Sequence, residues 1–165
     1  MKKLIFIRHG KAEDESPEIS DLERSLTLKG KAISQRMAIK LLEKEGSLGT
    51  VVTSPAFRAL ETALIFMGEY GINAENLILN SSIYFSLSLK NLPSVLSCVK
   101  EDEDIVTLFG HNPSFSQIAD NLSKEGCDFI PKSGVVCISF NIATWSEIKR
   151  NTGRIECFLK PENIL

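Results

Sequence analysis

Short apolar runs alternate with longer amphipathic segments along this chain of 165 residues. The short runs are rich in β-branched residues and too brief for helices, so they predict buried strands. The predicted strands are 4–7, 50–53, 77–79, 105–109, 135–140 and 155–159. In the longer segments apolar residues recur every three or four positions, which predicts amphipathic helices. The predicted helices are 27–45, 55–67, 92–99 and 113–122.

Strands that alternate with helices predict an α/β fold, a three-layer α/β/α sandwich with a mostly parallel central sheet of about six strands. About 14 residues separate the last two strands, so this pair is predicted to be antiparallel. The hydrophobic content of 43% and charged content of 24% are those of an ordinary globular protein. We expect a single domain over residues 1–165.

Charge and cysteine spacing narrow the function classes. Nineteen basic against 21 acidic residues give a net charge of −2, which creates no overall field for nucleic acid or an anionic membrane, and we expect neither as a partner. Only four apolar residues separate Lys3 from Arg8, too few for a signal peptide or a membrane span. The four cysteines lack the short spacing of zinc sites, so we expect no metal, a reducing cytoplasmic location and thiols that act as small core residues. They are Cys98, Cys127, Cys137 and Cys157.

Polar residues gather where three of the predicted strands end. Both histidines of the chain, His9 and His111, are among them, together with Arg8 and Arg58. The three segments are Arg8-His9-Gly10, Ser54-Pro55 with Arg58 just beyond it, and Gly110-His111-Asn112-Pro113. Open α/β sheets bind ligands at the carboxyl ends of their strands, so we expect these side chains to converge on one edge.

Two of these segments have the pattern of a helix start. Ser54-Pro55 and Asn112-Pro113 each predict an N-cap followed by proline at the first helical position. Helix starts present unpaired N–H groups and a positive dipole end, which favour an anion. Arg58 would lie in the first turn, where a cation is unfavourable unless an anion docks beside it. The alternative is that its side chain simply points to solvent.

Two arginines and two histidines around one anion indicate phosphoryl transfer. Arginine binds phosphate through a planar, bidentate fork, and neutral imidazole is a nucleophile that can carry a phosphoryl group. A second, protonated imidazole can stabilise charge on the transferring group.

The same residues resemble the signatures of a known family. Arg8-His9-Gly10 resembles the RHG motif of the histidine phosphatase superfamily, also called phosphoglycerate-mutase-like. The second and third motifs are similar to Ser54-Pro55-x-x-Arg58-Ala59-x-x-Thr62 and Gly110-His111-Asn112-Pro113. The resemblance extends from Leu4 to about Pro161 and implies that His9 is the phosphorylated nucleophile. It also implies that Arg8, Arg58 and His111 form the phosphate pocket.

Within that superfamily the chain looks most like the SixA-type phosphohistidine phosphatases. The stretch from Asp21 to Gly30 resembles their Asp-x-x-Arg-Pro-Leu-Thr-x-x-Gly pattern, with Ser25 in place of the proline. The resemblance implies an enzyme that needs no cofactor and acts on phosphohistidine in a protein.

One departure bears on the substrate. Mutase-like members carry a glutamate acid after the middle strand, but residues 81–88 hold no carboxylate, and Asn112 stands where acid phosphatases have aspartate. General acid catalysis contributes about 10²–10⁴-fold for an ester, whereas imidazole can leave without a strong acid. The sequence therefore favours phosphohistidine. Two alternatives stay open: a phosphomonoesterase for small phosphorylated metabolites that takes its acid from the 10–25 loop (Glu13, Asp14 or Asp21), and an inactive phosphate-binding relative.

Overall fold

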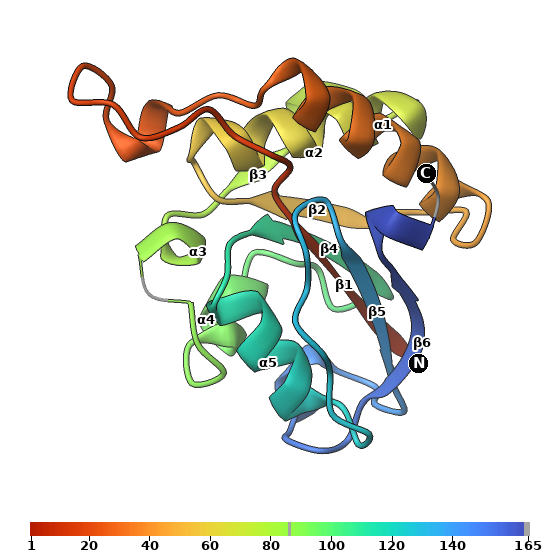
Figure 1. Cartoon of the computed structure of the whole chain (residues 1–165). Helices are drawn as coiled ribbons and strands as arrows, with labels where there is room; N and C mark the ends of the chain where they lie inside the picture. Colours follow the sequence, from red (N-terminus) through yellow and green to blue (C-terminus); the bar gives the residue numbers. More distant parts are fainter. Residues whose placement is uncertain (86, 164–165) are drawn as a thin grey trace.

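A computed structural model describes residues 1–85 and 87–163 and contains a central six-stranded sheet (Figure 1). The strands lie in the order β3-β2-β4-β1-β5-β6. Their bounds are β1 Lys2–Arg8, β2 Thr50–Thr53, β3 Ile78–Leu79, β4 Ile105–Gly110, β5 Val135–Phe140 and β6 Arg154–Leu159. The pairs β3–β2, β2–β4 and β4–β1 are parallel, whereas β5 is antiparallel to both of its neighbours. The predicted α/β class, mostly parallel sheet and antiparallel final pair are confirmed.

Helices cover both faces of the sheet. Helices α1 and α2 lie on one side, and α4 and α5 lie on the other, below the sheet in Figure 1. The helices are α1 Leu28–Leu42, α2 Phe57–Glu69, α3 Ser82–Phe85, α4 Leu92–Leu96 and α5 Ser114–Leu122, with short 3₁₀ turns at Asp21–Glu23, Ala74–Asn76, Trp145–Glu147 and Pro161–Asn163.

Strand β1 shows why its sequence is continuously apolar. Leu4 and Phe6 belong to the core beneath α4 and α5, whereas Ile5 and Ile7 belong to the core beneath α1 and α2. Successive side chains of a strand point to opposite faces, and a strand covered on both faces buries all of them. All four are fully buried.

The prediction that Pro55 and Pro113 occupy the first positions of their helices is wrong. Helix α2 begins at Phe57 and α5 at Ser114, so Pro55 and Pro113 both precede the helices. The Ser54 hydroxyl accepts the Ala56 N–H at 3.3 Å in the turn before α2, instead of capping the helix itself. The N-cap residue of α5 is Pro113 rather than Asn112, although Asn112 Oδ1, one position earlier, accepts the Ser116 N–H at 3.2 Å.

Residues 10–25 form a long, largely exposed loop between β1 and α1, drawn in red and orange at the upper left of Figure 1. Its two arms are tied by backbone hydrogen bonds from Glu13 N to Ser25 O (2.9 Å) and from Thr27 N to Lys11 O (2.9 Å). Thr27 also caps α1 by accepting the Gly30 N–H at 2.9 Å. Among residues 1–85 and 87–163, no helix has the length and apolar character needed to cross a membrane.

Candidate active site

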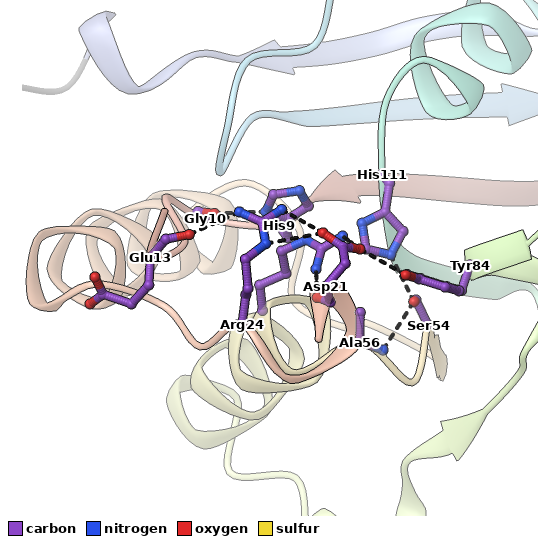
Figure 2. A network of polar contacts seen from close by, with 10 residues as sticks. His9, Gly10, Glu13, Asp21, Arg24, Ser54, Ala56, Tyr84 and His111 are labelled. Atoms are coloured by element: carbon purple, nitrogen blue, oxygen red, sulfur yellow. Dashed lines mark hydrogen bonds and ion pairs between the residues drawn. The ribbon is translucent and has the colours of Figure 1, made fainter. Parts of the chain in front are cut away.

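The ends of three neighbouring strands are joined by backbone hydrogen bonds. Ser54 N donates to Phe109 O and His9 N donates to Gly110 O, each at 3.0 Å. This alignment follows directly from the parallel order β2-β4-β1. It brings the rings of His9 and His111 to a centroid distance of 5.1 Å, as the sequence predicted (Figure 2).

His9 is a buried, neutral imidazole with one nitrogen available. Its side chain is 8% exposed, and its Nδ1–H donates to the Gly10 carbonyl at 2.7 Å. A carbonyl can only accept, so Nδ1 carries the ring proton and Nε2 carries the lone pair. The pKa of His9 is lowered to about 3, chiefly by burial. The nearby His111, Arg58 and Arg8 also lower the pKa, whereas the Gly10 hydrogen bond acts to raise it. His9 therefore has the protonation state of a nucleophile near neutral pH.

His111 is also neutral but uses its nitrogens differently. Its Nε2 lies 2.7 Å from the Ser54 hydroxyl, which already accepts the Ala56 N–H. The Ser54 proton can thus go to Nε2, which leaves the ring proton on Nδ1, a buried atom without a partner. Burial, followed by the charge of Arg58, lowers the pKa of His111 to about 4. The expected protonated second imidazole is therefore a neutral hydrogen-bond donor in the ligand-free protein.

The two arginines come from different elements: Arg8 is the last residue of β1, and Arg58 lies in the first turn of α2. Arg8 donates through Nη1 to Ile130 O at 3.0 Å and lies 5.1 Å from the centre of the Phe129 ring. Arg58 is 6% exposed, so the alternative that it points to solvent is wrong. Among the described residues, the buried side-chain polar atoms without a partner are Arg8 Nε, Arg58 Nε and His111 Nδ1. Each is a donor, which is the complement of an anion.

Of the three candidate acids in the loop, only Asp21 is brought to the site. Desolvation acts to raise its pKa, but hydrogen bonds from Tyr84, Arg24 and Arg58 outweigh this and hold the pKa well below its usual range. Asp21 is therefore ionised and cannot serve as a proton donor near neutral pH. Glu13 and Asp14 lie exposed on the loop, and the carboxylate of Glu13 points away from His9 in Figure 2.

Tyr84, which the sequence reasoning missed as a site residue, lies beside His111. Its ring meets the His111 ring at a centroid distance of 5.6 Å and an angle of 80°. No pattern in residues 81–88 indicates its role, because the direction of the Tyr84 side chain depends on the turn of α3. Within residues 1–85 and 87–163, no three His, Cys, Asp or Glu side chains come together as a metal ion would require.

Gly10 and Thr62 hold the loop start against α2. Gly10 N donates to Thr62 Oγ1 at 3.0 Å, and Thr62 Oγ1 donates to Arg58 O at 2.6 Å. A Cβ at Gly10 would lie 2.5 Å from Ser34 Oγ, so a larger residue would have to displace this hydroxyl from its hydrogen bond with Ser133. The second motif thus includes a threonine that fixes the backbone beside His9.

Comparison with solved structures defines the class of fold. The protein histidine phosphatase SixA complexed with tungstate matches with a TM-score of 0.82 at 19% sequence identity, covering 99% of both chains. A structure described as SixA from Agrobacterium tumefaciens gives 0.76 at 19% identity over 97% of this chain and 99% of the other. Phosphoserine phosphatase from Entamoeba histolytica, in complex with 3-phosphoglyceric acid, gives 0.66 at 16% identity over 100% of both. No protein-family model and no curated protein sequence matches this chain.

The chain therefore has the fold of the histidine phosphatase superfamily. SixA structures are among the neighbours that match nearly its full length, which confirms the fold expected from the three motifs.

Proposed function

We propose that this protein is a phosphatase that works through a phosphohistidine intermediate on His9. One observation carries the proposal: a neutral His9 with its Nε2 lone pair free lies in a site with three buried donors that lack partners, on Arg8, Arg58 and His111. A phosphoryl group supplies the oxygens that would satisfy those donors. A simple buried core histidine would not need two arginines with open N–H groups beside it.

The reaction follows from these protonation states. The Nε2 lone pair of His9 forms a bond to phosphorus while the bond from phosphorus to the leaving group breaks. Arg8, Arg58 and the Nδ1–H of His111 stabilise negative charge on the phosphoryl oxygens. Water then attacks phosphorus, the bond to Nε2 breaks, and the water proton remains on the released phosphate. His9 returns to its neutral form.

The proposed substrate is phosphohistidine in a protein. A phosphohistidine ring that is protonated on its second nitrogen leaves as neutral imidazole and needs no strong acid. Asp21 is ionised and Glu13 points away, so neither supports the alternative of a phosphomonoesterase with a loop acid. The printed name of one neighbour, protein histidine phosphatase SixA, supports the same substrate class.

The test compares two substrates in the presence of EDTA: a phosphohistidine-bearing protein and an alkyl phosphate. We expect phosphate release from phosphohistidine, with slow or absent release from the ester. Brief exposure to labelled substrate should leave acid-labile, alkali-stable label on His9.

The control is His9→Asn, in which the side-chain amide can replace the Nδ1 donor to Gly10 but no nucleophile remains. It should bind inorganic phosphate and release none from substrate. Faster ester hydrolysis would overturn the substrate assignment, whereas binding without turnover in the wild-type protein would identify an inactive phosphate-binding relative.

A further inference from the structure

The hydroxyl of Tyr84 donates to the carboxylate of Asp21, which also accepts from Arg24 (Figure 2). The same carboxylate accepts from Arg58 of α2. Tyr84 donates to Asp21 Oδ2 at 2.7 Å. Arg24 donates to Asp21 Oδ1 from Nε at 3.0 Å and from Nη2 at 2.8 Å. Arg58 donates from Nη2 to Oδ2 at 3.0 Å, so one carboxylate joins the 10–25 loop, α2 and α3.

Asp21 determines which edge of the Arg58 guanidinium is free. Its carboxylate accepts from Nη2, and its backbone carbonyl accepts from Nη1 at 2.6 Å. The outer edge between these two nitrogens is therefore occupied. Nε, on the adjacent edge, is buried and has no partner, and a guanidinium binds phosphate through two neighbouring N–H groups of one edge.

Asp21 needs support to hold this position, because its side chain is 42% exposed on a loop. Tyr84 can give that support because its ring is in contact with the ring of His111 in the site. The ring lies edge-to-face against His111 and against Phe85, with centroid distances of 5.6 and 4.7 Å. The Tyr84 hydroxyl therefore reaches Asp21 from the α3 side of the site.

We propose that Tyr84 is a positioning residue that, through Asp21, keeps the Nε edge of Arg58 turned toward the phosphoryl group. This role rests on the proposed function, since it requires an anion between Arg58 and the histidines.

The test is tungstate binding, measured by calorimetry, in Tyr84→Phe. Loss of one partly exposed hydrogen bond to a carboxylate should weaken tungstate binding about three- to ten-fold. Because Arg58 would bind the phosphoryl group before and during the reaction, KM should rise while kcat changes less. Tyr70→Phe is the matched control: it also removes a phenol hydroxyl, one that donates to Glu45 O at 2.9 Å, and should change neither value.

A double-mutant cycle with Asp21→Ala separates positioning from a general structural effect. If Tyr84 acts through Asp21, Tyr84→Phe should have no further effect in the Asp21→Ala protein. Additive losses, or unchanged binding in Tyr84→Phe, would overturn the positioning role and leave the phosphatase proposal standing. A wild-type protein that binds neither tungstate nor phosphate would instead refute the phosphate site itself.

A separate observation concerns two cysteines on the last two strands. Cys137 and Cys157 are direct partners in the antiparallel register of β5 and β6, and their Sγ atoms lie 3.1 Å apart as free thiols. Opposed residues of antiparallel strands have Cα atoms about 4.5–5.5 Å apart, within the span of a disulfide. The expectation that all four cysteines are core residues is wrong, since Cys98 is exposed and only Cys137 is fully buried.

The two thiols differ in environment. Cys157 is partly exposed on the edge strand β6, whereas Cys137 is buried on the neighbouring strand β5. Their mutual contact, together with burial, raises the pKa of Cys137, and the same contact lowers the pKa of Cys157. Exposure and acidity both select Cys157 as the thiol that reacts first.

The geometry points to an intrachain disulfide between Cys137 and Cys157, formed by a peroxide. The Cys157 thiolate attacks one peroxide oxygen, the O–O bond breaks, and a sulfenic acid and hydroxide form. The Cys137 sulfur then attacks the Cys157 sulfur, the S–O bond breaks and the S–S bond forms. The departing hydroxyl and the earlier hydroxide leave as two waters, with the protons that the thiols lose.

The test treats the whole protein with hydrogen peroxide, then alkylates it in urea and counts thiols. Free thiols should fall from the four cysteines of the chain to two, with a linked 137–157 peptide that dithiothreitol separates. The double variant Cys98→Ser/Cys127→Ser should still lose the free thiols of Cys137 and Cys157 on oxidation. The variant Cys157→Ala should form no intrachain disulfide. Sulfinic acid on Cys157, or dimers linked through Cys98 in place of the intrachain bond, would refute the pair.

Discussion

Acidification from pH 7.5 to 4.5 should destabilise the ligand-free fold through His9 and His111. Burial holds their folded-state pKa values at about 3 and about 4, below the ordinary value of 6.5. The unfolded chain therefore binds more protons between pH 6.5 and these values, so stability falls as the pH falls through that window. Asp21 has a depressed pKa and loses its contribution only below the ordinary carboxyl range near pH 4.

The magnitude follows from the shifts. One pKa unit corresponds to about 1.4 kcal/mol, and pH 4.5 lies about two units below the unfolded histidine value. Each ring should therefore cost about 2.5 kcal/mol, and the pair at most about 5 kcal/mol. This is a large share of a typical unfolding free energy of about 5–15 kcal/mol.

Urea unfolding at the two pH values measures the effect. The comparison variant is His9→Asn/His111→Gln, whose side-chain amides do not titrate: the Asn nitrogen can donate to Gly10 O as Nδ1 of His9 does, and the Gln oxygen can accept from Ser54 as Nε2 of His111 does. Most of the pH-dependent loss should disappear in this variant. An equal loss in both proteins would refute the assignment of the two buried neutral histidines.

Three further changes test the site. Arg58→Lys removes the two-nitrogen edge of the guanidinium and should lower the rate of phosphate release from phosphohistidine at subsaturating substrate about 100-fold; an unchanged rate would contradict a role for Arg58. Glu13→Gln and Asp14→Asn should each leave that rate unchanged, because both side chains are exposed on the loop, and a slow variant would restore the loop-acid alternative. Thr62→Val leaves the buried Gly10 N–H without its partner and should cost about 1–3 kcal/mol in urea unfolding, with an unchanged midpoint as the contrary result.

The sequence pattern predicted most of the fold because buried strands and amphipathic helices have different periods. The continuous apolar run in β1 and the helical spacing in α1 are both visible without coordinates. Helix starts were predicted less well. Pro55 and Pro113 matched the pattern of first helical residues, but Ser54 bonds to His111 and the turns before the helices take their shape from the site.

The convergence of His9, Arg58 and His111 was also predictable, because parallel strands place their carboxyl ends on one edge. Tyr84 was not, since its contact with Asp21 joins residues 63 positions apart on two short helical turns. The Cys137–Cys157 contact likewise depends on the register of β5 and β6.

The sequence by itself determined the strand and helix order, the three strand-end motifs and the residue types suited to phosphate. Local periodicity and the edge rule of parallel sheets are enough for that. Only the tertiary structure decided the states of those residues: neutral histidines, an ionised Asp21, and arginine edges that are occupied or free. Protonation and hydrogen-bond partners depend on burial and on neighbours distant in sequence, so they exist only once the chain has folded.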